Sequence, residues 1–123
     1  MLLLFGTPVT ANAPIDNIDL NTKDGILAYI ALEAPKQGVE ASIVADVIRC
    51  ESEFRGGVYG DSGMAYGLAQ FWPETFERLS KKAGIPEMYE RGDYRSQIKT
   101  LIWSIKNGSG GEWTCFTKIT HRL

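Results

Sequence analysis

Five glycines fall within twelve residues near the middle of the chain: Gly56, Gly57, Gly60, Gly63 and Gly67. Glycine weakens helices and strands alike, because its backbone loses the most conformational freedom on folding. A continuous helix or a long strand is therefore not expected in this segment. We expect short β-like or irregular structure between Val58 and Tyr66, with regular elements on either side.

Helical patterns stand on both sides of this loop. Apolar residues recur at intervals of three and four residues, as on one face of a helix, and caps, prolines and glycines mark the ends. The pattern predicts four or five helices. Four of them can be placed: one capped by Asn21 or Thr22 that ends at Ala34, and three at about residues 40–54, 73–82 and 94–106. Pro35 is expected to end the first helix, and the last five residues are expected to be irregular. The fold class is therefore mainly α: a small domain of four to six helices with one glycine-rich, partly β-like loop.

Length and charge narrow the classes of function. The chain has 123 residues, a length typical of one domain. Its 13 Lys and Arg residues nearly balance its 15 Asp and Glu residues, for a net charge of -2, which gives no general attraction to nucleic acid or anionic lipid. The only histidine is His121, so a metal site or catalytic triad built on histidine is not expected. We expect no nucleic-acid partner, no metal and no organic cofactor.

Residues 1–13 stand apart from the predicted helices. They open on an apolar run that is far too short to span a bilayer and end in Ala11-Asn12-Ala13, the small-residue pattern at which signal peptidase cleaves. A positively charged start is missing. Two interpretations remain open: a remnant of a signal peptide, or a disordered arm. The first implies that a single domain at residues 14–123 is exported to the periplasm, the cell envelope or the extracellular space.

The chain has two cysteines, Cys50 and Cys115. They cannot complete a structural zinc site, which needs four ligands. In an exported protein an even count favours one disulfide, which here would close a long loop. In a cytosolic protein the same pair would be two buried free thiols. We expect the disulfide.

Glu51 is the most informative polar residue of the predicted second helix. It follows Val47 by four residues and Ile48 by three, which puts its carboxyl group beside the apolar face. Partial removal from water raises the pKa of a carboxylic acid, and an acid that is still protonated near neutral pH can serve as a general acid. The alternative is that Glu51 only borders the core and reaches solvent.

The segment after Glu51 is suited to a cleft. Glycines let a polymer approach the backbone closely, and the Gln70 side chain offers a donor and an acceptor to a sugar. Two short motifs occur in this region: Glu51-Ser52-x-Phe54 and Gly67-Leu68-x-Gln70-Phe71. Together and in this order, they are similar to those of the lysozyme-like lytic transglycosylase domain, over about residues 21–116.

The resemblance implies a peptidoglycan-cleaving enzyme of lysozyme-like fold. Glu51 would be the acid and base that cleaves the β-1,4 bond between N-acetylmuramic acid and N-acetylglucosamine and leaves a 1,6-anhydro end. Ser52 would hold this acid by hydrogen bonding, or else close the helix end, and Gln70 and Phe71 would line the sugar groove. Short members of the family pair a cysteine just before the acid with a late one. The partner would be peptidoglycan glycan strands, bound by a monomer.

The roles of other residues near the motifs remain open. Asp61 forms part of a turn, or it activates water as a second carboxylate, as in goose-type lysozymes; the enzyme would then be a hydrolytic muramidase. The family's Asn-x-x-x-Gly-x-x-Tyr pattern is missing, which leaves Tyr66 and Tyr59 as candidates for a tyrosine near the acid. Trp72 is a candidate wall of the groove. The alternative from another class is a noncatalytic glycan-binding module.

Overall fold

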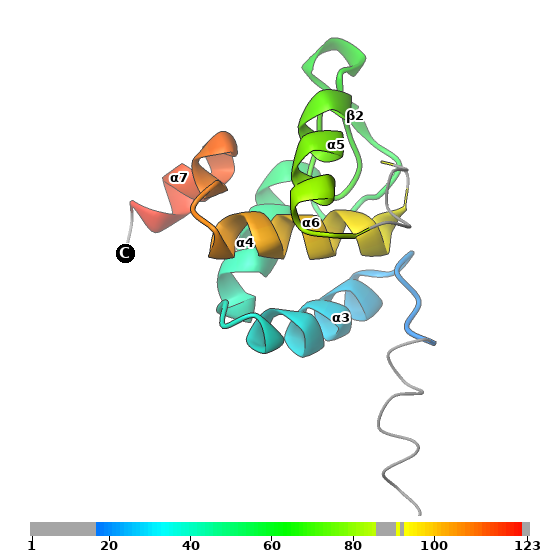
Figure 1. Ribbon diagram of the computed structural model, residues 1–123. Coiled ribbons are helices and arrows are strands. Elements are labelled where there is room, and N and C mark those ends of the chain that lie inside the picture. Colours follow the sequence, from blue (N-terminus) through cyan, green and yellow to red (C-terminus); the bar gives the residue numbers. More distant parts are fainter. Residues whose placement is uncertain (1–16, 86–90, 92, 122–123) are drawn as a thin grey trace, which may run out of the picture.

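The computed structural model describes residues 17–85, 91 and 93–121. The expected leader, residues 1–13, lies outside the described residues. Helices make up most of the described chain (Figure 1): α3 (Lys23–Lys36), α4 (Ala41–Ser52), α5 (Pro73–Lys82), α6 (Tyr94–Lys106) and α7 (Thr114–Thr120). A two-stranded sheet lies between α4 and α5 in the chain. The predicted mainly α fold is confirmed.

Local signals determine where three of the helices begin. Pro73 occupies the first turn of α5, where a missing N–H costs no helical hydrogen bond. The Asp93 side chain caps α6 and accepts a hydrogen bond from the Arg95 N–H at 3.0 Å. Thr22 caps α3 in the same way, through the Gly25 N–H at 3.0 Å. Both α5 and α6 have the predicted bounds.

Helix α3 extends beyond its predicted end, and helix α7 was not among the predicted helices. α3 continues through Pro35 to Lys36. A proline lacks only its own N–H, and the N–H groups of Gln37 and Gly38 still bond to the Ala34 and Pro35 carbonyls of the last turn. α7 runs to Thr120, so the prediction that the last five residues are irregular is wrong for its final turn. Ile119 packs against the core there and stabilises that turn.

Helix α4 ends at Ser52, two residues before the predicted end at Phe54. Glu53 and Phe54 adopt left-handed backbone conformations, with φ of 54° and 63°, through which a right-handed helix does not continue. The Glu53 N–H still bonds to the Arg49 carbonyl and closes the last turn. The chain therefore leaves α4 sharply, and Glu51 stands in the last turn of the helix, where the loop begins.

The glycine-rich loop folds into a small antiparallel hairpin, in agreement with the short β-like structure expected between Val58 and Tyr66. Strands β2 (Tyr59–Gly60) and β3 (Ala65–Tyr66) are joined by a short 3-10 turn, η1 (Asp61–Gly63). In the hairpin register, Tyr59 lies opposite Tyr66. The hairpin lies beyond one end of α5 in Figure 1. The next residues turn back, so that Tyr66 and Phe71 exchange both backbone hydrogen bonds.

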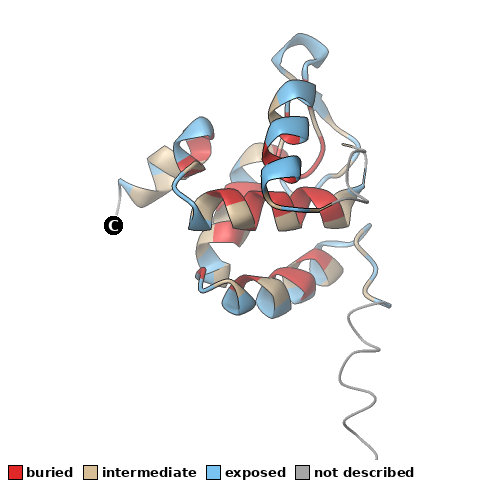
Figure 2. Ribbon diagram, viewed as in Figure 1, coloured by how far each residue is buried: buried red, intermediate tan, exposed pale blue. Residues whose placement is uncertain are grey.

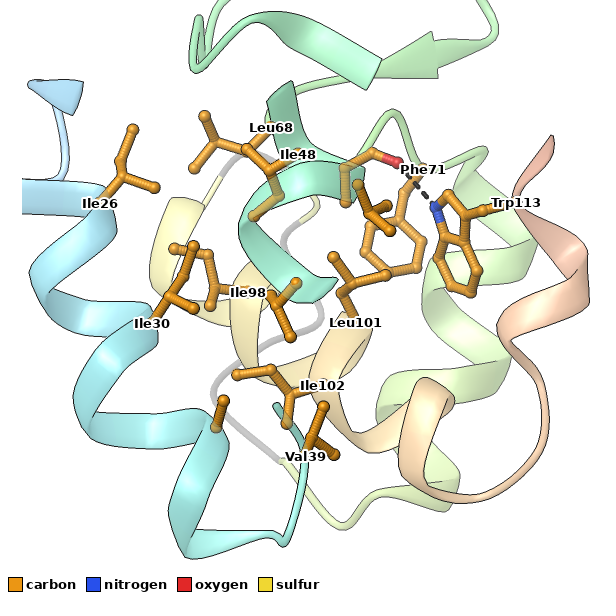
Figure 3. Packing of buried hydrophobic residues seen from close by; sticks show 14 of the residues in the cluster. Ile26, Ile30, Val39, Ile48, Leu68, Phe71, Ile98, Leu101, Ile102 and Trp113 are labelled. Atoms are coloured by element: carbon orange, nitrogen blue, oxygen red, sulfur yellow. Dashed lines mark hydrogen bonds between the residues drawn. The ribbon is translucent and has the colours of Figure 1, made fainter. Parts of the chain in front are cut away.

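The core lies between α3, α4 and α6 and extends to the turn after the hairpin. Figure 2 shows that the buried residues of α3 and α6 face one another, and α4 packs against both α3 and α7. Figure 3 shows how the buried side chains fill this space; they include Ile26, Ile30, Ile48, Leu68, Phe71, Ile98, Leu101 and Ile102, each at most 1% exposed. Each such burial stabilises the fold by about 2 kcal/mol. Because Leu68 and Phe71 belong to the turn, the core fixes the turn in place.

The last segments bring the chain back to α4. A short 3-10 turn, η3 (Gly110–Glu112), precedes α7, and the predicted disulfide joins Cys50 of α4 to Cys115 of α7. Trp113, which lies between η3 and α7 in the chain, is buried. Its indole N–H donates to the Ala69 carbonyl at 2.8 Å, the dashed line in Figure 3. None of the helices in the described ranges has the length and hydropathy that crossing a membrane requires.

Candidate active site

The carboxyl group of Glu51 borders a pocket of about 270 Å³. Its walls come from the end of α4, the hairpin, the start of α5, and the segment formed by η3 and α7. The lining residues are Glu51, Asp61, Gln70, Phe71, Trp72, Thr75, Glu112, Trp113, Thr114, Cys115 and Lys118. The fold therefore brings five of the predicted site residues together around one cavity, although they are spread over 22 positions of the sequence from Glu51 to Trp72.

The surroundings of Glu51 raise its pKa from 4.5 to about 7. Burial of the carboxyl group is the largest cause, because it disfavours the charged form, and the negative charge of Asp61 acts in the same direction. Two groups of α7 oppose them: the Cys115 backbone N–H donates a hydrogen bond to the carboxylate, and Lys118 contributes a positive charge. Glu51 can therefore hold a proton near neutral pH.

This pKa predicts how stability depends on pH. Between pH 4.5 and about 7 the folded protein keeps a proton on Glu51 that the unfolded chain releases, so the free energy of unfolding falls across this window and levels off above it. The loss at Glu51 is up to about 3 kcal/mol, reduced by the solvent in the pocket. We expect Glu51→Gln to unfold like the wild type near pH 4 and to be more stable near pH 8. Urea unfolding of both proteins at the two pH values tests this; a variant that is less stable near pH 8 would contradict it.

A hydrogen bond connects Asp61 to the pocket. The Trp72 indole N–H donates to the Asp61 carboxylate, in the turn of the hairpin, at 3.0 Å. Asp61 and Ser62 both adopt left-handed conformations, with φ of 49° and 58°, as in a tight turn. Asp61 is thus both a turn residue and a member of the pocket lining, so the geometry leaves both interpretations from the sequence standing.

Gln70 ties the turn to the hairpin. Its side-chain nitrogen donates to the Gly67 carbonyl at 2.9 Å and to the Val58 carbonyl at 3.1 Å. Its backbone is left-handed, with φ of 54°. The amide oxygen faces Gly60, where a Cβ atom would lie only 2.3 Å from it. Glycine at position 60 thus makes room for the Gln70 side chain in the pocket wall.

A buried amide on α6 supports the same turn. Gln97 is fully buried; its side-chain oxygen accepts from the Ala69 N–H at 2.9 Å, and its nitrogen donates to the Tyr66 carbonyl at 2.9 Å. A Cβ atom at Gly67 would lie 2.1 Å from that nitrogen. This role was missed in the sequence, where Gln97 stands directly before the apolar residue Ile98. A polar amide within an apolar helix face is the signal that could have found it.

Two predicted site residues, Ser52 and Tyr66, lie outside the lining, and Phe71 belongs to both the lining and the core. The Ser52 hydroxyl donates to the Ile48 carbonyl at 3.1 Å, within its own helix, and Ser52 is not among the lining residues. Tyr66 is also outside the lining and packs its ring on Tyr59, with ring centroids 4.6 Å apart. Phe71 is 1% exposed and makes edge contacts with Phe76 and Trp113, so it serves the core as well as the pocket wall.

Five lining residues were not candidates for the site in the sequence: Thr75, Glu112, Trp113, Thr114 and Lys118. Three of them lie on η3 and α7, close to the C-terminal end of the described chain. Glu112 is held by Arg78 of α5 through an ion pair of 2.7 Å. No group of three His, Cys, Asp or Glu side chains within residues 17–85, 91 and 93–121 is arranged to hold a metal ion.

Comparison with known proteins gives one match. No curated protein and no solved structure matches the chain significantly. The family model described as "Transglycosylase SLT domain" matches residues 28–107. This range contains Glu51 and Gln70 and ends before η3 and α7. Since the match covers more than half of the chain, the protein belongs to the transglycosylase SLT domain family, whose members act on peptidoglycan.

Proposed function

We propose that the protein is a lytic transglycosylase that cleaves the β-1,4 bond between N-acetylmuramic acid and N-acetylglucosamine, with Glu51 as its only acid and base. The observation that carries the proposal is a carboxylic acid in the pocket wall whose pKa lies at about 7. The protein is exported, acts as a monomer on peptidoglycan glycan strands, and needs no metal or organic cofactor.

One carboxyl group is sufficient for this reaction. Protonated Glu51 gives its proton to the glycosidic oxygen, the bond from that oxygen to C1 of the muramic acid breaks, and N-acetylglucosamine leaves with a free 4-hydroxyl. Ionised Glu51 then takes the proton of the muramic 6-hydroxyl while O6 attacks C1. The products are a 1,6-anhydro end and Glu51 in its starting protonation state, and no water is consumed.

The other predicted site residues have supporting roles in this proposal. Gln70, Phe71 and Trp72 form the wall against which the sugar rings lie, and Trp72 is exposed enough, at 43%, to stack on one. Ser52 supports Glu51 indirectly, since its hydroxyl bonds to the Ile48 carbonyl in the same helical turn. Tyr66 acts through the hairpin, because its strand carries the chain into the Gln70 turn.

Asp61 supports a second candidate, a hydrolytic muramidase. Its carboxylate belongs to the same pocket and is oriented by the Trp72 N–H. Inverting glycosidases use a second carboxylate of this kind to activate water. The product would then carry a reducing end in place of the anhydro ring. The two reactions share Glu51 as the acid and differ only in what attacks C1.

Mass spectrometry of the muropeptides released from purified sacculi distinguishes the candidates. Anhydro ends support the transglycosylase, and reducing ends, heavier by one water, support the hydrolase. Binding to sacculi without any product would overturn both and favour a noncatalytic glycan-binding module. Glu51→Gln is the matched negative control, because it keeps the shape of the side chain and removes the acidic proton of the carboxyl group.

The variant Asp61→Asn is expected to retain most of the turnover and to yield the same anhydro ends, because the proposed reaction uses one carboxyl group. The measurement is the rate of muropeptide release, with Asp46→Asn as a control for loss of a carboxylate outside the pocket lining. A loss of about a thousandfold or more with Asp61→Asn alone, several kcal/mol of transition-state stabilisation, would instead assign Asp61 to water activation.

A further inference from the structure

The end of the hairpin that carries Asp61 lies beyond the backbone pairs that shape this part of the fold. The pairs of β2 with β3, and of Tyr66 with Phe71, stop short of Asp61 on one side and of Trp72 on the other. Both residues line the pocket, and the Trp72 indole N–H donates to the Asp61 carboxylate at 3.0 Å. The spacing between these two wall residues therefore depends on side-chain contacts.

Arg91, which precedes α6 in the chain, supplies a second contact of this kind. One nitrogen of its guanidinium group, Nη1, donates to the Met64 carbonyl at 2.5 Å and to the Phe71 carbonyl at 2.8 Å. Met64 directly follows η1, and Phe71 directly precedes Trp72. A single side chain thus bridges the two backbone segments that carry Asp61 and Trp72.

Two further contacts hold Arg91 itself. Its guanidinium carbon lies 5.5 Å from the centroid of the Tyr66 ring, a distance at which a cation is attracted to the face of an aromatic ring. Its backbone carbonyl accepts a hydrogen bond from the Gln97 side-chain nitrogen at 2.7 Å. Because Gln97 is fully buried, Arg91 is anchored to the core of the protein. A guanidinium keeps its charge and its donors at every pH at which a protein is folded.

The contacts that would remain without the Arg91 side chain hold a different part of this region. Gln97 and the Tyr66–Phe71 pair fix the turn at its base. Within the described residues, the hydrogen bonds that reach η1 and Met64 from outside the hairpin come from Trp72 and Arg91. Loss of the Arg91 donors leaves the exposed indole bond alone, which opens readily because water can replace each partner.

We propose that Arg91 is a positioning residue for the wall of the sugar groove: it holds the end of the hairpin against the segment before α5, so that Trp72 stays in one orientation for stacking on the substrate. This inference rests on the proposed function, in which a sugar ring lies on Trp72. A half-exposed ring that is ordered before the sugar arrives loses less freedom on binding. The bonds of Arg91 go to the hairpin and the turn, whereas Glu51 belongs to α4, so substrate binding is affected rather than the chemical step.

The variant Arg91→Met tests this, because methionine keeps a long side chain and removes the donors. The first readout is the NMR resonance of the Trp72 indole N–H, assigned with Trp72→Phe. Asp61→Gly gives the position of this resonance without the carboxylate partner, and glycine suits the left-handed backbone at position 61. In Arg91→Met we expect the Trp72 resonance to move toward that position. The Trp113 indole, bonded to Ala69 in the core, should keep its resonance.

The second readout is the kinetics of cleavage of soluble, uncross-linked glycan strands. We expect Arg91→Met to raise KM about tenfold, the size of one aromatic contact, and to leave kcat close to the wild-type value. Arg49→Met is the matched control: it removes a surface guanidinium of α4 that pairs with Asp46, and both the Trp72 resonance and KM should stay unchanged.

The indole resonances need no substrate, so they separate this inference from the proposed function, whose failure would be the absence of cleavage products from the wild type. A Trp72 resonance that is unchanged in Arg91→Met would overturn the inference. Displacement of the Trp72 and Trp113 resonances together would also overturn it, because Arg91 would then support the whole fold. So would a fall in kcat at constant KM, since the side chain would then act on the chemical step.

Discussion

Replacement of Glu51 by glutamine is expected to lower the turnover of peptidoglycan by about a thousandfold or more. General acid–base catalysis contributes about 100 to 10,000-fold, and in the proposed reaction Glu51 performs both proton transfers. Glutamine keeps the size of the side chain, so the pocket should keep its shape. The measurement is the initial rate of muropeptide release from sacculi, followed by chromatography and mass spectrometry.

The neighbouring Glu53 provides the matched control. Glu53 lies two residues on, with its side chain 74% exposed and paired with Arg55 on the surface. Glu53→Gln removes the same charge from the same end of α4 and should turn over at close to the wild-type rate. If both variants are equally active, Glu51 is not the acid. If both are equally inactive, the loss reflects the end of the helix rather than the carboxyl group in the pocket.

The helices of this protein are predictable from its sequence because their information is local. Apolar spacing, the caps Thr22 and Asp93, and Pro73 at the start of a helix each act within one or two turns. The errors at the ends of α3 and α4 have equally local causes. In α3, a proline in the last turn removes only one hydrogen bond, so the helix continues through it. In α4, two successive residues with left-handed backbones, Glu53 and Phe54, end the helix although its apolar pattern would continue.

Part of the site can also be predicted from the sequence alone. Glu51 stands beside an apolar face at a helix end, and the resemblance of the two motifs points to Gln70 as a second member. The pocket contains both, and the raised pKa of Glu51 has the predicted cause, burial beside the core. The prediction depends on a carboxylate near apolar neighbours three and four residues away, which is again a local pattern.

The remaining members of the site depend on contacts between distant parts of the chain. Gln97 supports the turn at Ala69, 28 positions away in sequence, and Arg78 holds Glu112, 34 positions away. The spacing of residues along one helix does not indicate which residues of distant segments they will contact. The contribution of α7 was missed for the same reason: the disulfide and the Trp113 bond to Ala69, which bring the end of the chain back onto α4, join residues far apart in the sequence.

Removal of the disulfide is expected to lower the free energy of unfolding by about 4 kcal/mol, because the cross-link between residues 65 positions apart restricts the unfolded chain. For a chain of this length the melting temperature should fall by about 15 °C. Urea unfolding of the double variant Cys50→Ala, Cys115→Ala against the oxidised protein measures the loss.

A reductant should destabilise the wild type to the same extent and leave the double variant unchanged. A loss well below 1 kcal/mol, within the range of an ordinary surface substitution, would contradict the prediction. It would mean that the unfolded chain already keeps α4 and α7 close together, since the entropic effect of a cross-link depends on how far its ends can separate when the protein unfolds.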